Sequence, residues 1–341
     1  MNGPLISVIM AAYNCDQFVG EAVRSIQEQS YGNWEMICVD DCSTDGTYDV
    51  LQGLARSDGR IKVLRNEENL GCAATRNAAL EHAQGELIAL QDADDLSLPD
   101  RFERSLPLVQ DADLVGSDVF VVDETGRQVG RYYAGWDPRQ MSAWDWLMGG
   151  RTLFMEPTFT ARREALPIPM YNALFRVALD YDMFLRMAAL GCRFCKLDSP
   201  VYVGRRRKAQ VTNRLAYEAY FEKLVAQQGA LALKEGQPFD YAQALAVAQE
   251  DPGHVARAHL RAGWIALMRS DLGLAKSHLG QAARMSPTRA QALPLSVLSY
   301  LPRVLRSPIV SALITVAEIK PAVVRLARRI TQPSGPGRDE Q

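Results

Sequence analysis

The chain has little net charge, few histidines and no cysteine spacing typical of a disulfide-rich domain. Its 341 residues carry a formal charge of -2. This gives no overall basic field for nucleic acid, so no nucleic-acid partner is expected. Six cysteines are scattered along the chain beside only four histidines, which argues against a disulfide framework. Cys192 and Cys195 form a lone CxxC pair, for which ordinary thiols are favoured over a zinc or redox site.

The segments typical of export, membrane insertion and dinucleotide binding are also missing. The first ten residues lack a basic stretch followed by a long apolar run. The uncharged stretch 307–317 is shorter than the ~20 apolar residues that span a bilayer. We therefore expect a cytoplasmic protein. Residues 11–16 contain neither Gly nor Lys, which disfavours a nucleotidyltransferase and a GxGxxG dehydrogenase.

Short apolar runs alternate with stretches of helical period in the first two thirds of the chain. Such alternation is typical of an α/β fold with a mainly parallel sheet flanked by helices. The predicted strands cover residues 5–11, 34–39, 61–64, 87–90 and 114–115, and the predicted helices cover 18–26, 45–55, 72–83 and 99–109.

The strand signals stop near residue 213, which predicts four parts. Residues 1–213 form the α/β domain, and residues 214–293 form a helical module that is rich in Ala, Leu and Gln. One helix pair in this module is tetratricopeptide-like, but a single copy favours a small cap or docking module over a repeat array. Residues 294–330 form a basic amphipathic segment that either lies on an anionic membrane surface or packs on the body. Residues 331–341 form a flexible tail.

Acidic side chains follow several of the predicted strands. Because parallel strands point their carboxyl ends to one edge, we expect these carboxylates to converge there. Crowded carboxylates repel one another unless they hold a cation, and hard oxygen ligands favour Mg²⁺ or Mn²⁺ with a diphosphate. Asp-Ala-Asp at residues 92–94 is expected to be extended, with both carboxylates on one side. The alternative is that such acidic turns are solvated or cap helices. Residues 43–45 are expected to cap the next helix, and Asp40 or Asp41 to face the ligand. The six carboxylates belong to Asp40, Asp41, Asp45, Asp92, Asp94 and Asp95.

Four ordered motifs carry a family resemblance. They are Ile6-Ser-Val-Ile-Met-Ala-Ala-Tyr-Asn14, Val39-Asp-Asp-Cys-Ser-Thr-Asp-Gly-Thr47, Asn69-Leu-Gly-Cys-Ala-Ala-Thr-Arg-Asn77 and Gln91-Asp-Ala-Asp-Asp95. Over residues 4–213 the chain resembles a family 2 glycosyltransferase with the GT-A fold. In the second motif the family usually has Gly or Asn where Cys42 stands.

The resemblance implies a nucleotide-sugar site at these motifs. Arg76 would lie beside the nucleotide, the alternative being a helix-face pair with an acid such as Glu81. For Tyr13 the alternative is an ordinary surface aromatic. Ala12 would form part of the nucleotide-binding turn, Tyr13 would stack or pack on the nucleobase, and Asp41 would accept a hydrogen bond from a ring N–H of that nucleobase. Asp92 would lie near the ribose, and Asp94 would bind the divalent metal, Mg²⁺ or Mn²⁺.

Residues 179–186 resemble the family segment Glu-Asp-Tyr-Asp-Leu-Trp-Leu-Arg, whose first Asp is the catalytic base of inverting members. That position is Asp180, with Asp182 as the alternative base and Leu179 in place of the usual Glu. Arg207 stands where many relatives have a His. It would clamp the diphosphate, or else belong to a solvated basic loop.

Two further sets of residues are expected near the acceptor. Glu156 and Thr158 are predicted to meet sugar hydroxyls. Three tryptophans would either stack on a sugar or close a lid. These tryptophans are Trp136, Trp144 and Trp146.

The resemblance therefore predicts a metal-dependent inverting glycosyltransferase. It would move a sugar from a UDP- or dTDP-sugar to a saccharide or polyprenyl-linked acceptor during cell-surface polysaccharide synthesis. The reaction would take place in the cytoplasm, with peripheral contact at the inner face of the membrane. The alternative is a catalytically degenerate scaffold whose helical tail binds partners, because Leu179 and Arg207 depart from the family pattern.

Overall fold

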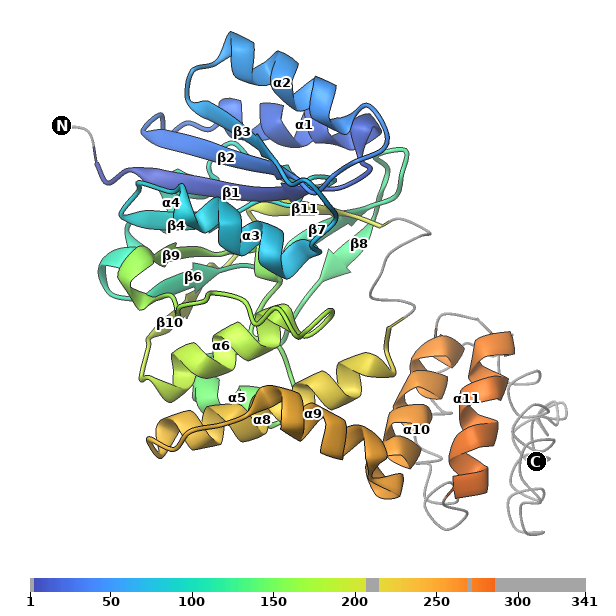
Figure 1. Ribbon diagram of the computed structural model, residues 1–341. Coiled ribbons are helices and arrows are strands. Elements are labelled where there is room, and N and C mark those ends of the chain that lie inside the picture. The colour runs from blue at the N-terminus through green and yellow to red at the C-terminus, as the bar shows by residue number, and fades with distance from the viewer. Residues whose placement is uncertain (1–2, 207–214, 269–271, 286–341) are drawn as a thin grey trace, which may run out of the picture. The chain divides into compact units, whose positions relative to one another are not determined.

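The computed structural model describes residues 3–206, 215–268 and 272–285 (Figure 1). These residues form two compact units. The first takes the residues up to 206 together with 222–242, and the second takes the remainder. The units thus do not follow the predicted boundary at residue 213, because part of the helical region packs within the first unit.

A seven-stranded sheet forms the centre of the first unit, in the order β10-β6-β9-β4-β1-β2-β3. All its pairings are parallel except those of β9, which runs antiparallel to β4 and β6. The mainly parallel α/β fold is therefore confirmed. The strands are β1 (Ile6–Ala12), β2 (Trp34–Asp40), β3 (Ile61–Arg65), β4 (Leu87–Leu90), β6 (Leu114–Gly116), β9 (Thr160–Arg162) and β10 (Phe194–Lys196).

Helices cover this sheet and bury its apolar side chains. On α1 (Asp16–Gln27) the residues Val19, Val23 and Ile26 are fully buried at helical spacing against the strands. Figure 1 shows α1 and α2 (Thr47–Ser57) together above β1, β2 and β3, while α3 (Cys72–Glu81) lies in front of the sheet.

The helix predicted at 99–109 is interrupted. It becomes α4 (Arg101–Ser105) and the short 3-10 helix η1 (Leu108–Gln110). Pro107 lies between them, and proline has no N–H to continue the helical hydrogen bonds.

A smaller four-stranded sheet was not expected from the sequence. Its strand order is β5-β11-β7-β8, and β11 pairs in parallel with β7 and antiparallel with β5. Because β5 follows β4 directly, this sheet begins beside the acidic 92–95 turn. Its strands are β5 (Leu96–Ser97), β7 (Val119–Val122), β8 (Gln128–Tyr132) and β11 (Tyr202–Arg205).

Short helical elements fill the rest of the first unit, and longer helices follow it in the chain. The helical character predicted for 214–293 is confirmed as far as the chain is described, whereas the segments 294–330 and 331–341 lie outside the described residues. Among the described helices, none has the length and apolar character needed to cross a bilayer. The elements are α5 (Ala143–Met148), η2 (Glu156–Thr158), η3 (Arg163–Ala165), α6 (Leu179–Ala189), α8 (Glu218–Lys234), α9 (Tyr241–Glu250), α10 (Pro252–Met268) and α11 (Leu272–Met285).

Candidate active site

The turns after β1 and β2 are joined to each other by hydrogen bonds. The Asp41 N–H donates to the Ala12 carbonyl at 2.8 Å, and the Asn14 N–H donates to Ser43 Oγ at 3.0 Å. In return, the Thr44 N–H donates to Asn14 Oδ1 at 2.9 Å. Tyr13 remains 49% exposed at this edge. The predicted nucleotide-binding turn is therefore held rigidly, with one aromatic ring available to a ligand.

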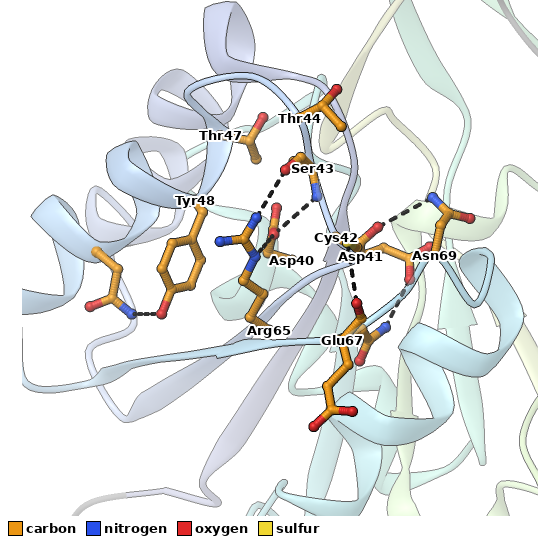
Figure 2. Close-up of polar contacts among 12 residues, drawn as sticks. Asp40, Asp41, Cys42, Ser43, Thr44, Thr47, Tyr48, Arg65, Glu67 and Asn69 are labelled. Atoms are coloured by element: carbon orange, nitrogen blue, oxygen red, sulfur yellow. Dashed lines mark hydrogen bonds and ion pairs between the residues drawn. The ribbon is translucent and has the colours of Figure 1, made fainter.

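Asp40 is a buried structural carboxylate. Its Oδ2 lies 3.1 Å from Arg65 Nε and accepts the Ser43 N–H at 3.1 Å. Figure 2 shows the Arg65 guanidinium joining Asp40 to the backbone of Ser43. Of the two candidates, Asp40 thus turns inward beneath the turn.

Asp41 organises the loop that leads into α3. Its Oδ1 accepts from the Leu70 N–H and from Asn66 Nδ2, both at 2.8 Å, and its Oδ2 accepts from the Gly71 N–H at 2.9 Å. Gly71 has a φ of 83°, a left-handed conformation that glycine adopts without strain. The role of Asp41 toward a base stays a prediction.

The capping expected of residues 43–45 is correct only for Asp45. Asp45 Oδ1 accepts from the Thr47 N–H at the start of α2, at 2.9 Å. Ser43 and Thr44 bond to Asn14 instead. These two residues therefore lock the two turns together rather than cap the helix.

The Asp92–Asp95 segment forms a turn, so the expected extended conformation is wrong. The Asp95 N–H approaches the Asp92 carbonyl at 3.4 Å, which closes the turn. Gln91 is fully buried beneath it, and its Nε2 donates to the carbonyls of Asp92 and Asp95 at 3.0 Å each. The Tyr202 hydroxyl accepts from the Asp92 N–H at 3.0 Å.

Arg205, in strand β11, fastens the same turn from the other side. Its N–H donates to Asp95 Oδ1 at 2.6 Å, and its Nε donates to the Asp94 carbonyl at 3.1 Å. Tyr202 and Arg205 were not identified from the sequence, because they lie more than 100 positions away from the turn and no local pattern marks them. Gln91 was noted only as the first residue of the Gln91–Asp95 motif, without a role.

The six carboxylates are not left without protein partners at the edge of the sheet. Asp40 pairs with Arg65, Asp41 and Asp45 accept backbone N–H groups, Asp92 pairs with Arg76, and Asp95 accepts the Arg205 N–H. Within the described residues no three Asp, Glu, His or Cys side chains are arranged to hold a metal ion.

Asp94 nevertheless fits a metal that is shared with a substrate. It is half-buried at the acidic turn, and its charge and that of Asp92 add to the effect of burial in raising the pKa of Asp95 well above its usual value. Mg²⁺ typically uses one or two carboxylates and completes its shell with water and substrate phosphates. The donor set fits that mode, with hard oxygens and no protein cage.

Arg76 links two acidic residues that lie far apart in the sequence. Its Nη2 lies 2.6 Å from Asp92 Oδ1, and its Nη1 lies 2.9 Å from Glu156 Oε2. The Arg76 side chain is only 7% exposed. The pairing with Glu81, which was the alternative for Arg76, is thus replaced by a bridge across the site.

Asp180 stands in the first turn of α6 and belongs to the same electrostatic site. Burial raises the pKa of Asp180, and the nearby charges of Lys223 and Arg76 oppose this rise. Burial also raises the pKa of Glu156 to about 7; Arg76 counteracts this effect, and Asp180 and Asp92 add to it. The charges of Asp92, Arg76, Glu156 and Asp180 therefore act on one another within one region.

Several predicted acceptor-side residues have structural partners instead. Thr158 is fully buried, and its Oγ1 accepts from the Ser117 N–H at 2.9 Å, so it is not exposed to a sugar. Trp136 is 3% exposed and donates to the Met141 carbonyl, and Trp146 donates to the Thr152 carbonyl. Asp182, the alternative base, is buried against Arg186 at 2.8 Å. Arg207 lies outside the described residues.

Comparison with known proteins places this fold in a family of glycosyltransferases. The model of Glycosyl transferase family 2 matches residues 7–167. Bacillus subtilis EpsE is 36% identical over 208 residues, which cover 59% of this chain and 73% of EpsE. The chain belongs to glycosyltransferase family 2.

A second relative and two solved structures extend the comparison. Escherichia coli WfgD, named as a UDP-Glc:alpha-D-GlcNAc-diphosphoundecaprenol beta-1,3-glucosyltransferase, is 38% identical over 32% of this chain and 42% of its own length. Residues 1–349 of Staphylococcus aureus TarS in complex with UDP-GlcNAc give a TM-score of 0.56 at 20% identity, covering 91% of this chain and 90% of that TarS chain. The mannosyltransferase PcManGT from Pyrobaculum calidifontis, in complex with GDP-Man and Mn²⁺, gives 0.52 at 23% identity, covering 92% and 86%. These structures support the GT-A fold alone.

Proposed function

We propose that this protein is an inverting, metal-dependent glycosyltransferase that uses a UDP- or dTDP-sugar. The observation that carries the proposal is the Arg76 bridge, which joins Asp92 of the acidic turn to Glu156 at 2.6 and 2.9 Å. The bridge connects the nucleotide side of the site to the region whose charges act on Asp180. Donor and base are thereby expected to meet at one reacting carbon.

In the proposed reaction Asp180 is the general base. Its carboxylate accepts the proton of an acceptor hydroxyl while that oxygen bonds to the anomeric carbon. The bond from this carbon to the diphosphate breaks on the opposite face, so the configuration inverts. A divalent ion bound at Asp94 would stabilise the negative charge on the departing diphosphate.

The remaining residues would bind and orient the donor. Tyr13 would pack on the base, Asp41 would accept from the base ring N–H, and Asp92 would lie near the ribose. The backbone of Ala12 would complete the nucleotide pocket. Arg76 holds Asp92 in place through its ion pair. Arg207, outside the described residues, would contact the diphosphate.

The comparisons support the substrate classes. TarS was crystallised with UDP-GlcNAc, and PcManGT with GDP-Man and Mn²⁺. The printed name of WfgD gives it a diphosphoundecaprenol-linked acceptor. We propose that this protein uses a saccharide or polyprenyl-linked acceptor in the synthesis of surface polysaccharide. The reaction would take place in the cytoplasm, at the inner face of the membrane.

The test is turnover of a donor panel by the full chain. Release of nucleoside diphosphate from UDP-glucose, UDP-GlcNAc, dTDP-rhamnose and GDP-mannose is measured with Mg²⁺, with Mn²⁺ and with EDTA. Asp180→Asn is expected to lower kcat by about 100- to 10,000-fold, the usual contribution of a general base. Asp94→Asn should abolish the response to metal, whereas Asp49→Asn on the exposed face of α2 should leave it intact. Absence of release from every donor would contradict the proposal.

A further inference from the structure

Helix α8 contributes a buried carboxylate to the segment that leads into α6. Glu222 is 4% exposed, and its carboxylate accepts three consecutive backbone N–H groups. The donors are Arg176 at 2.8 Å, Val177 at 2.9 Å and Ala178 at 2.8 Å. Ala178 is the residue that caps α6, and Asp180 is two residues further on.

These three bonds hold the segment that enters α6. The Ala178 N–H belongs to the N-cap of the helix, and N–H groups at the start of a helix lack partners within the helix. The N-cap residue, Ala178, makes no side-chain capping bond of its own. The N-terminus of α6 is therefore fixed from another helix.

Two further residues of α8 contact the residue next to Asp180. Gln227 Nε2 donates to the Tyr181 hydroxyl at 2.8 Å and to the Met148 carbonyl at 2.9 Å. Lys223 Nζ lies 4.6 Å from the centre of the Tyr181 ring. Figure 1 shows α8, drawn in yellow, alongside α5 and α6. Helix α8 thus contacts the chain both before Asp180, at residues 176–178, and directly after it, at Tyr181.

We propose that Glu222 is a positioning residue for Asp180, and that α8 is a functional part of the active site. The proposal rests on the proposed role of Asp180 as the base. Glu222 lies beyond residues 7–167, which the family model matches. If the carboxylate is lost, the 176–178 segment loses its acceptors and the Asp180 side chain moves relative to the donor. A displacement of about 1 Å in a catalytic group can cost about 100-fold in rate.

The main experiment compares Glu222→Gln with Glu235→Gln in the full chain. Gln has the same shape as Glu, but it places an amide N–H among the three donors. Glu235 directly follows α8 and is exposed, so its substitution removes the same charge without touching α6. We expect kcat to fall 10- to 100-fold in Glu222→Gln with little change in donor KM, and neither value to change in Glu235→Gln. Glu222→Asp, which retains the carboxylate, should recover part of the loss.

The pH profile separates positioning from general destabilisation. Activity of a carboxylate base falls as pH drops through its pKa, and burial holds the pKa of Asp180 above its ordinary value. When the start of α6 loosens, water reaches Asp180 and the acid limb of kcat should move to lower pH. A variant that merely unfolds more easily would lose amplitude without moving this limb. If Glu222→Gln retains the wild-type kcat and the acid limb of its pH profile does not shift, the proposal is overturned.

Two measurements keep the test decisive. If Glu222→Gln does not fold, Gln227→Met removes the bond to Tyr181 while filling a similar volume, and the same fall in kcat with the same shift is expected. Hydrogen exchange at the amides of 176–178 should accelerate in Glu222→Gln, and unchanged exchange would overturn the proposal without reference to turnover. Full activity in Asp180→Asn would instead contradict the proposed function, and the exchange result would still report on the Glu222 contact.

Discussion

Similar aspartates in this protein have different chemical roles because their surroundings differ. Asp40 pairs with Arg65, and Asp41 is bound by backbone N–H groups, so both hold the turns and loops at this edge of the sheet. The half-buried Asp94 is the carboxylate suited to a shared metal. Asp180 sits where burial raises its pKa, which suits a group that must accept a proton. Residue type alone does not distinguish these roles.

Glu156 should make the stability of the protein depend on pH. Burial raises the pKa of Glu156 to about 7, from an ordinary value of 4.5. Between these two values the folded state retains a proton that the unfolded state has released. The free energy of unfolding therefore falls as the pH rises from 4.5 through 7. In Glu156→Gln this decline should be missing, and relative to wild type the variant should gain about 1–3 kcal/mol between pH 5 and pH 8.

Denaturant unfolding at several pH values measures this effect. Glu67→Gln, at an exposed position in the loop after β3, serves as the control and should follow the wild type at each pH. Parallel curves for wild type and Glu156→Gln would show that Glu156 does not titrate in this range. Above pH 7, where Glu156 is ionised in the folded protein, donor turnover of Glu156→Gln should fall as well, because Arg76 loses one of its two charged partners.

Cys42 is a strained residue at the site. Its φ is 59°, in the left-handed region that L-residues with a side chain adopt at a cost, although Asn tolerates it better. This conformation explains why Gly or Asn is usual at this position in glycosyltransferase family 2. Cys42→Asn should raise the free energy of unfolding by about 0.5–1 kcal/mol, whereas Cys42→Ala, which retains the strain, should give no gain. Thermal unfolding distinguishes the two, and a lower midpoint for Cys42→Asn would disprove the strain argument.

At the scale of elements, burial determined which strands could be predicted from sequence. The strands β1, β2, β3 and β4 were located to within about one residue. Strands β1, β2 and β4 are buried on both faces, and such strands appear as nearly continuous apolar runs. The three-residue strands β9 and β10 and the exposed β8 carry no such run. The positions of these strands depend on pairing with strands that can be distant in the sequence.

The same limit applies to the candidate site. The turns after β1, β2 and β4 were identified from local motifs. The Arg76–Glu156 ion pair joins residues 80 positions apart, and the Glu222 contacts to α6 span 44 to 46 positions. Sequence spacing carries no signal for such contacts. Motifs thus predicted residues that would face a ligand, but not the residues that hold them.

Strand β11 should control donor binding through Tyr202. The fully buried Tyr202 hydroxyl accepts from the Asp92 N–H and from Gln91 Nε2. Tyr202→Phe leaves both donors without this acceptor, which costs about 1–3 kcal/mol of stability and loosens the acidic turn. Donor KM should rise in this variant. Tyr48→Phe on α2, which removes a hydroxyl that accepts from Gln52, should leave donor KM unchanged. Equal KM values for the two variants would exclude a role of β11 in shaping the turn.

At the scale of the whole molecule, the chain forms two compact units, and all the described site residues, including Glu222, belong to the first. A ligand that binds only the folded form stabilises the unit that holds its site, by about 2.7 kcal/mol at 100 times its Kd. UDP with Mn²⁺ should therefore delay the unfolding of the first unit. The second unit, which contains α10 and α11, should unfold at an unchanged temperature.

Hydrogen exchange during a thermal ramp follows the two units separately in the full chain. Peptides from β1 and α6 should gain protection with UDP and Mn²⁺, while peptides from α10 and α11 should not. In Asp94→Asn the increment due to Mn²⁺ should disappear, since the ion would lose its protein carboxylate and retain only the phosphates. Asp49→Asn should behave as wild type. If α10 and α11 gain as much protection as β1 and α6, the two units unfold together. If the extra protection due to Mn²⁺ persists in Asp94→Asn, another carboxylate binds the metal.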